Sequence, residues 1–435
     1  MARGKKKESA LTPEEKLAQA LVPVEEQPYK VPKNWCWTRL AHIAKWGSGG
    51  TPTRKNPDYY EGSISWIKTG ELNDDYIYET EEHISDEAVA HSSAKLFPIN
   101  TIAIAMYGAT IGKVGILGVE ATTNQACACA VASQAIDYKY LFRFAQSQKD
   151  AFIKKGKGGA QPNISQEIIK EHEIPLPPIA EQQRIVDRIE YLFAKLDEAK
   201  EKAQSVLDSF ETRKAAILHK AFTGELTAKW RAEHGVAMDT WEKCLLGDIF
   251  DLQAGKNISA SKINSTRTGE TPYPCFGGNG IRGYVEGFNR EGEHPIIGRQ
   301  GALCGNVNLA YGQFYATEHA VVVSYKREIT TTWAVHYLRF LNLNQYATAT
   351  AQPGLAVGNI VKIPVIYIPY EEQCELAGIL DSLFTKGQQA KEAAEAVLEK
   401  IDLLKKSILA RAFRGELGTN DPTEESALEL LKKVL

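Results

Sequence analysis

The sequence of 435 residues contains few of the features that mark membrane, secreted or metal-binding proteins. It has no run of the 18 or so apolar residues that a membrane-spanning helix needs. The seven cysteines are scattered, odd in number and without a C-x-x-C pair, which argues against a disulfide framework and a zinc site. The basic start of the chain is not followed by the apolar stretch of a secretory signal. These absences predict a protein of the reducing cytoplasm.

Catalytic signatures are also missing. The Asp/Asn-Pro-Pro-Tyr/Phe signature of amino-methyltransferases does not occur, and the nine histidines form no H-E-x-x-H cluster. The segment from Gly108 to Lys113 is one residue shorter than a P-loop, and Val114 stands where the magnesium-binding Ser/Thr is required. Cys127 and Cys129 alternate on an expected strand, where two buried thiols are a better interpretation than a metal site. We therefore expect no catalytic residue, no metal ligand and no cofactor in this chain.

Charge of one sign is scarce as well. The formal net charge is −3, with 43% hydrophobic and 24% charged residues, as in ordinary globular proteins. A lone DNA binder usually carries a strongly basic domain, so this charge argues mildly against one. A protein that shares phosphate contacts with basic partner subunits can be neutral overall. The dense basic cluster from Arg3 to Lys7 is interpreted as a solvated tail, with a phosphate clamp as the alternative.

An internal repeat organises the chain. Residues 174–226 and 365–417 match at a constant offset of 191 residues without a gap, and 20 of 53 positions are identical. Self-similarity of this kind indicates a duplicated structural unit. The identical pairs include Pro178/Pro369, Glu181/Glu372, Gln182/Gln373, Leu192/Leu383, Phe193/Phe384 and the closing Gly-Glu-Leu of residues 224–226 and 415–417.

Each copy is predicted to form a helix of some 40 residues, or roughly 60 Å at about 1.5 Å per residue. A proline precedes it, acidic residues follow in its first turn, and apolar residues recur at heptad spacing. The seam favours packing of the two copies against each other, antiparallel; packing of each on its own domain is the alternative. The expected seam positions are Ile185, Ile189, Leu192, Leu196, Ala199, Ala203, Val206 and Phe210, and Leu376, Leu380, Leu383, Ala390, Ala394, Val397, Ile401, Leu404 and Ile408, interrupted at Gly387.

The segments 36–173 and 240–364 are rich in glycine, aromatic and β-branched residues in short apolar runs, which indicates mixed domains with strands. They match each other weakly in the same order. The expected equivalences are Trp37, Leu40, Ile43 and Gly49 with Trp241, Leu246, Ile249 and Gly255; residues 107–114 with 300–307; residues 121–126 with 316–320; and residues 161–164 with 352–355.

The chain therefore reads as a globular domain followed by a helix, repeated twice, with the helices alike and the domains divergent. Duplex DNA has an approximate two-fold axis, and a pseudo-two-fold protein can place one head in each of two groove segments. Heads that differ would read half-sites that differ. The pattern predicts an α+β protein in which two mixed α/β domains are joined by an antiparallel coiled coil and read a split, asymmetric DNA sequence.

These residues also carry a family resemblance over roughly residues 30–420. IPLPPIAEQQRIV, AFTGELTAKWR, PYEEQCELAGILDSLF and SILARAFRGEL resemble the spacers of type I restriction–modification specificity subunits. Five further segments resemble motifs of the target recognition domains of this family: WTRLAHIAKWGSGGTPTRK, WEKCLLGDIFDLQAGK, WIKTGEL, YGATIGKVG and TTNQAC. The resemblance implies assembly on DNA with two methyltransferase subunits and with restriction subunits. It also implies that the partner, rather than this chain, binds S-adenosylmethionine and methylates adenine.

The expected domains are an N-terminal helical extension (1–35), target recognition domain 1 (36–173), spacer helix 1 (174–235), target recognition domain 2 (236–364), spacer helix 2 (365–417) and a C-terminal helix (418–435). Thr12 to Glu15 has the start signal of the N-terminal helix. Whether the two terminal helices meet each other or a methyltransferase is open.

Base reading needs Arg or Lys for guanine and Asn or Gln for adenine, and phosphate contacts need Lys, Arg, Ser, Thr and backbone N–H groups. The alternative for each candidate is an ordinary solvated loop, and Asn279-Gly280 is in itself a hairpin signal. The candidates are Ser48, Thr51, Thr53, Arg54, Lys55, Lys68, Thr69, Tyr107, Thr110 and Lys113 in the first domain, and Lys256, Asn257, Asn279, Arg282, Arg299 and Gln300 in the second.

Two other functions compete with the DNA reader. A coiled-coil scaffold that binds only proteins would not need two divergent heads on similar helices. A self-sufficient methyltransferase or nuclease would need the catalytic motifs that are missing.

Overall fold

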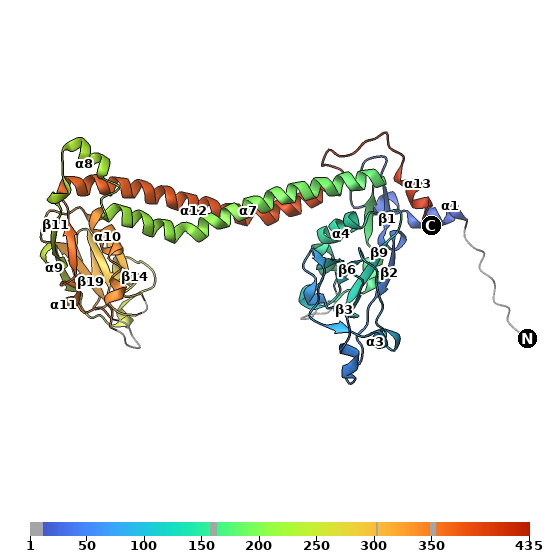
Figure 1. Cartoon of the computed structure of the whole chain (residues 1–435), viewed down its shortest axis with the longest axis horizontal. Coiled ribbons are helices and arrows are strands. Elements are labelled where there is room, and N and C mark those ends of the chain that lie inside the picture. The colour runs from blue at the N-terminus through green and yellow to red at the C-terminus, as the bar shows by residue number, and fades with distance from the viewer. Residues whose placement is uncertain (1–11, 157–162, 302, 349–353) are drawn as a thin grey trace, which may run out of the picture. The chain divides into compact units, whose positions relative to one another are not determined.

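The computed structural model describes residues 12–156, 163–301, 303–348 and 354–435. The chain divides into two compact units, which we describe separately (Figure 1). Unit 1 comprises residues 1–201 and 397–435, and unit 2 comprises residues 202–396. The basic cluster from Arg3 to Lys7 lies outside the described residues, as do parts of the expected match between residues 161–164 and 352–355.

Unit 1 contains a β domain built from three sheets. A five-stranded sheet has the order β2-β9-β6-β7-β4, a three-stranded sheet has the order β5-β3-β8, and β1 pairs with β10 antiparallel. Its elements are α1 (Pro13–Ala20), β1 (Cys36–Arg39), α2 (Leu40–Ile43), β2 (Ala44–Ser48), β3 (Ile64–Ile67), β4 (Tyr76–Ile77), β5 (His83–Ile84), α3 (Asp86–Ala90), β6 (Ile102–Ala105), β7 (Val114–Leu117), β8 (Ala121–Thr123), β9 (Cys127–Ala132), α4 (Tyr138–Ser147), α5 (Lys149–Lys155), α6 (Gln166–Lys170), β10 (Glu173–Leu176) and α13 (Ala427–Lys432).

Unit 2 repeats this plan with variations. Its sheets have the orders β12-β19-β16-β17 and β14-β13-β18-β15, and β11 pairs with β20 antiparallel. Its elements are α8 (Ala228–His234), β11 (Glu242–Leu245), α9 (Leu246–Ile249), β12 (Phe250–Ala254), β13 (Tyr273–Gly277), β14 (Gly280–Val285), β15 (Arg290–Glu291), β16 (His294–Gly298), β17 (Val307–Ala310), β18 (Gln313–Ala316), β19 (Ala320–Tyr325), α10 (Thr331–Phe340), α11 (Val357–Ile360) and β20 (Pro364–Tyr367).

The two β domains share a scaffold. The order β2-β9-β6-β7 corresponds to β12-β19-β16-β17, and the parallel pair β3·β8 corresponds to β13·β18. They differ beside this scaffold: unit 1 adds β4 and α3, whereas unit 2 adds the short β15 and has the longer hairpin strand β14 in the place of β5. The strands that the short apolar runs of both segments predicted are present, among them β6, β7, β9 and β19.

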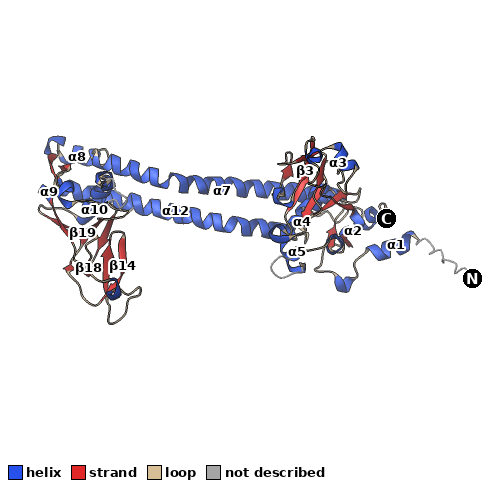
Figure 2. Cartoon of the chain, turned by 90° about the horizontal axis from the view of Figure 1, so that it is seen from below, coloured by secondary structure: helices blue, strands red, loops and turns tan. Residues whose placement is uncertain are grey.

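Two long helices run through both units, α7 (Ile179–Phe222) and α12 (Tyr370–Ala412), with 44 and 43 residues. Each begins directly after the proline predicted to precede it. Within unit 1 the first part of α7 packs against the last part of α12, where Ile185 and Ile189 share a core with Leu409. Within unit 2 the last part of α7 packs against the first part of α12, where Leu218 shares a core with Leu376. The two helices are therefore antiparallel, as predicted, and they lie side by side in both views (Figures 1 and 2).

The predicted seam holds for the first copy but only partly for the second. Every predicted seam residue of α7 is buried or half-buried. On α12, Leu376, Leu380 and Ile401 are buried, but Ala390, Val397 and Leu404 are exposed, so their assignment to the seam was wrong. Gly387 does not interrupt the helix.

Lys405 takes the place of an apolar residue at this part of the seam. Its Nζ lies 5.1 Å from the centroid of the Phe193 ring and 2.6 Å from Oδ1 of Asp197 on α7. The long side chain can cover an aromatic ring with its methylene groups while its charged end reaches a carboxylate. A heptad pattern read from apolar residues alone cannot identify such a position.

The first and last described helices of unit 1 lie together. Thr12 caps α1 through the predicted capping box with Glu15, which confirms the start of the N-terminal helix. Helix α1 packs against α13, and Nζ of Lys16 donates to the backbone oxygen of Leu435 at 2.9 Å (Figure 1). The described terminal helices therefore meet each other. The predicted C-terminal helix is shorter than expected, because it begins at Ala427 and the residues before it form turns and irregular coil.

Two of the predicted equivalences between the β domains are corrected. Cys36 pairs with Leu176 and Glu242 pairs with Tyr367, so the partner of Trp241 is Trp35 rather than Trp37. Thr123 and Ala316 end the matching strands β8 and β18, so the expected match of residues 121–126 with 316–320 is shifted by two positions at its start. Leu40, Ile43 and Gly49 keep their expected partners. In the described part of the chain, no helix is long and apolar enough to cross a membrane.

Candidate nucleic-acid interface

The loop after the first strand of the large sheet is anchored in the same way in both units. The N–H of Gly50 donates to the backbone oxygen of Thr123 at 2.9 Å, and the N–H of Lys256 donates to that of Ala316 at 2.9 Å. A Cβ on Gly49 or Gly255 would lie 1.9 or 2.1 Å from these same oxygen atoms. Glycine is therefore required where each loop crosses the neighbouring strand.

In unit 1 this loop, residues 48–55, is held at alternate residues. Nε1 of Trp66 donates to the backbone oxygen of Gly50 at 2.9 Å, and the hydroxyl of Tyr60 donates to that of Pro52 at 2.7 Å. Thr51 lies between these anchors, and Thr53, Arg54 and Lys55 follow them; all four are exposed. The anchored loop therefore presents the predicted contact residues Thr51, Thr53 and Lys55 to solvent.

Two predicted cations of unit 1, Arg54 and Lys68, meet at Glu82. Nη1 of Arg54 lies 2.6 Å from one Glu82 oxygen, and Nζ of Lys68 lies 3.0 Å from the other. The guanidinium of Arg54 also stacks over the Tyr60 ring, 4.0 Å from its centroid. The hydrogen bond from Arg54 lowers the pKa of Glu82, and Lys68 pairs in addition with Glu81 at 2.9 Å. Arg54 and Lys68 are thus neutralised within the protein, which the sequence did not suggest.

A second loop has the same backbone in both units. It connects β6 to β7 in unit 1 (residues 106–113) and β16 to β17 in unit 2 (residues 299–306). Both loops contain two glycines with positive φ, at 63° and 74° for Gly108 and Gly112, and at 89° and 86° for Gly301 and Gly305. Since this loop joins two antiparallel strands, it lacks the strand-to-helix geometry of a P-loop.

The remaining candidates of unit 1 lie near one or other of these loops. Nε2 of Gln166 donates to the hydroxyl of Ser48 at 3.0 Å, while Tyr107 forms a β-bridge with Asn163. The segment 163–166 therefore links Ser48 to Tyr107. Thr51 hydrogen-bonds Gln125, the Thr110 hydroxyl donates to the backbone oxygen of Tyr107 at 2.8 Å, Thr69 lies in the turn beside Lys68, and Lys113 ends the second loop.

In unit 2 the structure brings Asn279 and Gln300 together. β13 and β14 form the predicted hairpin, but its turn residues are Gly278 and Asn279 rather than Asn279 and Gly280. A Cβ on Gly278 would lie 3.1 Å from the backbone oxygen of Gln300. The Nδ2 of Asn306 donates to Oδ1 of Asn279 at 2.8 Å. The hairpin turn thus rests on the second loop.

The other candidates of unit 2 are more dispersed. Arg282 is exposed on β14, and Lys256 and Asn257 are exposed in the loop after β12. Nε of Arg299 donates to the backbone oxygen of Leu355 at 3.3 Å, which directs this side chain along the backbone of residues 354–355. Sequence reasoning missed Asn306, although it lies opposite the candidate Lys113 in the predicted alignment. It also missed Glu81 and Glu82, for which no sequence signal was available.

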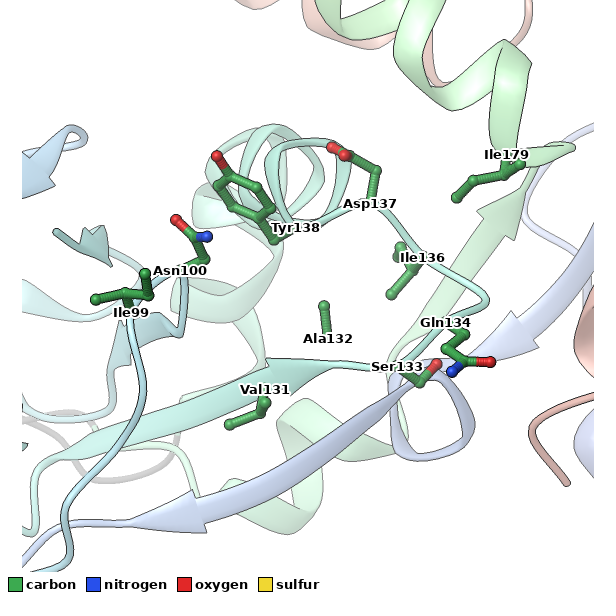
Figure 3. A pocket seen from close by; sticks show the side chains of 10 residues that line it. All are labelled: Ile99, Asn100, Val131, Ala132, Ser133, Gln134, Ile136, Asp137, Tyr138 and Ile179. Atoms are coloured by element: carbon green, nitrogen blue, oxygen red, sulfur yellow. The ribbon is translucent and has the colours of Figure 1, made fainter. Parts of the chain in front are cut away.

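A cavity of about 360 Å³ lies in unit 1 where β9, α4 and α7 begin or end (Figure 3). Ile99, Ile179 and Tyr138 line it together with Asp137. The polar atoms of two lining residues are already engaged: Oδ1 of Asp137 accepts from the N–H groups at the start of α4, and the Tyr138 hydroxyl pairs with that of Tyr76 at 3.0 Å. We assign no ligand to this cavity.

Cys127 and Cys129 are fully buried in one apolar cluster, as predicted for structural thiols. Burial raises the pKa of the Cys129 thiol to about 12, so it is not a reactive thiolate. Within the described residues, no group of three His, Cys, Asp or Glu side chains could hold a metal ion. The geometry thus defines a class of protein: a duplicated protein whose two β domains share a scaffold and differ in their exposed loops.

The comparisons with known proteins identify the family. The family model described as "Type I restriction modification DNA specificity domain" matches residues 32–207 and 238–400. The EcoprrI type I restriction enzyme specificity subunit of Escherichia coli is 34% identical over 363 residues, covering 80% of this chain and 87% of that protein. The StySPI specificity subunit of Salmonella potsdam is 21% identical over 93% of this chain and 96% of its own length.

A solved structure has the same fold. The HsdS subunit from Thermoanaerobacter tengcongensis superposes with a TM-score of 0.67 at 19% identity, covering 90% of this chain and 99% of that one. The chain belongs to the family of type I restriction–modification DNA specificity subunits. Members of this family recognise DNA and are not themselves catalytic.

Proposed function

We propose that this chain reads a split, asymmetric DNA sequence, with one recognition domain for each half-site. We take the recognition domains as residues 36–173 and 236–364, the spacer helices as 174–235 and 365–417, and the extensions as 1–35 and 418–435. The observation that carries the proposal is the shared scaffold of the two β domains, on which the exposed loops differ. A duplicated protein that read a symmetric sequence would keep these loops alike.

The partners in this proposal are double-stranded DNA, two methyltransferase subunits and the restriction subunits of the same system, in the cytoplasm. The methyltransferase subunits would hold S-adenosylmethionine and flip the target adenine out of the duplex. This chain would need no cofactor, since its task is to select the site. With a net charge of −3, it would share phosphate contacts with its partners, so the salt dependence of binding would belong to the complex.

The candidate contact residues are assigned within this proposal. In recognition domain 1, Thr51, Thr53 and Lys55 project from a loop that is fixed at Gly50 and Pro52, which suits contacts to phosphate or to base edges. Arg54 and Lys68 would exchange Glu82 for DNA only at an energetic cost, so we rank them below the free residues. In recognition domain 2, Asn279 and Gln300 form the most compact candidate group.

The experiment that tests the proposal is to co-express the chain with its genomic neighbours, purify the complex and map methylated adenines by single-molecule sequencing. We expect a split motif with two unlike halves that is lost when this chain is omitted. Replacing residues 36–173 by the domain of a relative should change one half only. A complex that methylates without a motif would instead indicate a scaffold that binds only proteins.

A further inference from the structure

The loops 106–113 and 299–306 share their backbone hydrogen bonds among the described residues. The N–H of Gly112 donates to the backbone oxygen of Ala105 at 3.0 Å, and that of Gly305 donates to Gly298 at 2.8 Å. Equivalent bonds close each turn, from Ile111 to Gly108 at 3.2 Å and from Cys304 to Gly301 at 3.0 Å. A neighbouring segment is held alike, from Ile164 to Met106 at 2.9 Å and from Leu355 to Arg299 at 2.8 Å. The backbone of the loop is therefore independent of its exposed side chains.

Those exposed side chains differ in chemistry. Tyr107 is 45% exposed and corresponds to the exposed Gln300. The half-buried Lys113 corresponds to the exposed Asn306. A fixed backbone that carries different side chains in two heads is expected of a surface that recognises different sequences.

In unit 2 the loop gains a partner from the hairpin. Asn306 uses an Nδ2 donor on Oδ1 of Asn279, which holds both side chains in place. No other side-chain hydrogen bond involves these two amides among the described residues, and the amide of Gln300 has none there either. The braced pair therefore keeps a donor, Nδ2 of Asn279, and an acceptor, Oδ1 of Asn306, for another molecule.

Adenine presents one acceptor, N7, and one donor, the N6 amino group, in the major groove. The unused donor and acceptor of the asparagine pair complement this edge, and so does the intact amide of Gln300. We propose that Asn279, Gln300 and Asn306 read an A·T base pair in the half-site of recognition domain 2. The adenine read is not the one that becomes methylated, because that base leaves the duplex. This inference rests on the proposed function.

The corresponding loop of recognition domain 1 lacks these amides. Tyr107 and Lys113 occupy the positions of Gln300 and Asn306, and a lysine suits guanine or phosphate rather than adenine. The two heads would therefore prefer different bases at the equivalent point of their half-sites.

Asn279→Asp is the sharpest test. The aspartate keeps an oxygen that can accept from Asn306, but it replaces the unused donor by an acceptor, which is wrong for N7 of adenine. Gln300→Leu removes the second amide, and Leu303→Ala in the same loop is the matched control. Each variant is co-expressed with the partner subunits, and methylated sites are mapped by single-molecule sequencing. Thermal unfolding and co-purification with the methyltransferase check that each variant is intact.

We expect Asn279→Asp and Gln300→Leu to relax one A·T position in one half-site. The preference for adenine there should fall about 5- to 150-fold, which is equivalent to about 1–3 kcal/mol. The other half-site should keep its sequence, and Leu303→Ala should leave the whole motif unchanged.

Two results would overturn the inference while the proposed function stands: a wild-type motif retained by both variants, or equal weakening at all sites regardless of sequence. A wild-type complex that yields no split motif would overturn both the inference and the proposed function.

Discussion

The two units bury the same glutamate at the start of a long helix but neutralise it differently. Glu372 of α12 is fully buried and accepts from Arg231 at 2.5 Å, from the Thr227 hydroxyl at 2.6 Å and from Nε1 of Trp241 at 2.9 Å. All three donors lie in the continuous segment that follows α7 and leads into the second recognition domain. In unit 2, therefore, the segment that directly follows α7 connects this helix to the start of α12.

In unit 1 the counterpart Glu181 is also buried, but its cation is Arg184 on the same helix. Arg184 forms a two-pronged pair with Glu424, with both distances 2.8 Å, and the Thr419 hydroxyl donates to Glu181 at 2.7 Å. Burial raises the pKa of Glu181. Here the segment that follows α12 makes the same connection through the side chains of Thr419 and Glu424.

The neighbouring glutamine shows what both units keep. Nε2 of Gln182 donates to the backbone oxygen of Ala135 at 3.0 Å, and its Oε1 accepts from the N–H of Asp137 at 2.7 Å. Gln373 accepts from the N–H of Thr330 at 3.1 Å and donates to the backbone oxygen of Glu328 at 3.3 Å. The repeated Glu-Gln pair thus makes two connections at the start of each long helix. The glutamate binds the segment that follows the other long helix, and the glutamine binds the recognition domain that precedes its own helix.

The largest expected effect is from removing the buried glutamates. Glu372→Ala leaves Arg231, whose side chain is 9% exposed, without its carboxylate, and we expect a loss of about 3–5 kcal/mol. Glu181→Ala should cost less, because Arg184 is 38% exposed and keeps Glu424. Because the chain has two units, hydrogen exchange resolved by peptide should be used rather than one melting temperature. Equal losses in the two units would contradict the comparison.

The second prediction concerns the helix seam. Ile401 of α12 is 2% exposed, so Ile401→Ala should destabilise unit 1 by about 2–5 kcal/mol. Leu404, which the heptad pattern also placed in the seam, is 48% exposed, and Leu404→Ala should change stability by no more than about 0.5 kcal/mol. Urea titration followed by circular dichroism of the helices measures both. A large loss of stability for Leu404→Ala would instead show that Leu404 belongs to a regular heptad seam.

Acid should weaken both units through one buried histidine in each. Burial lowers the pKa of His172 and of His336 to about 4, below the usual value of 6.5. The unfolded chain therefore binds these protons first, and stability should fall as the pH drops from about 6.5 to about 4, by up to roughly 3 kcal/mol for each histidine.

The two histidines differ in their partners, which sharpens this test. His172 lies 2.8 Å from Nζ of Lys155 and 3.1 Å from Oε1 of Gln148, whereas Nδ1 of His336 is buried without a partner. His336→Phe should reduce the acid sensitivity of unit 2 at little cost at pH 7, and His172→Phe should cost more there. Urea titration at pH 7 and at pH 4.5 measures the free energy of unfolding of each variant. If these histidines do not titrate, the variants will lose as much stability between the two pH values as the wild type.

Among the substitutions of buried groups, the smallest loss is expected at the two threonines. Thr227→Ala and Thr419→Ala each remove one hydroxyl donor from a buried glutamate, at a cost of about 1–3 kcal/mol. We expect the loss to be larger for Thr227, whose hydroxyl also accepts from Arg231 at 2.7 Å. Serine at either position should restore the hydrogen bond and most of the stability. If the threonine acts only through packing of its methyl group, serine will be no more stable than alanine.

The sequence alone determined the duplication, the two long helices and their antiparallel pairing. These follow from local periodicity and from identities between the two copies, such as Glu181/Glu372. Both copies make the same kind of contacts at the start of a long helix, so the same residues are needed in each. The glycines of the second loop could also be aligned, since a positive φ restricts the residue type at Gly112 and Gly305. The predicted alignment of the two β domains was wrong where it depended on a single residue, as for Trp37 and Trp241.

Only the tertiary structure decided which exposed side chains are available for contact. Glu82 lies far along the chain from Arg54 yet neutralises it, and Asn306 reaches Asn279 across the hairpin turn. The exposure of Leu404 likewise depends on how α12 meets α7. Periodicity and residue type act locally along the chain and can be read from the sequence, whereas ion pairs, amide pairs and burial depend on distances between remote segments, which only the fold sets.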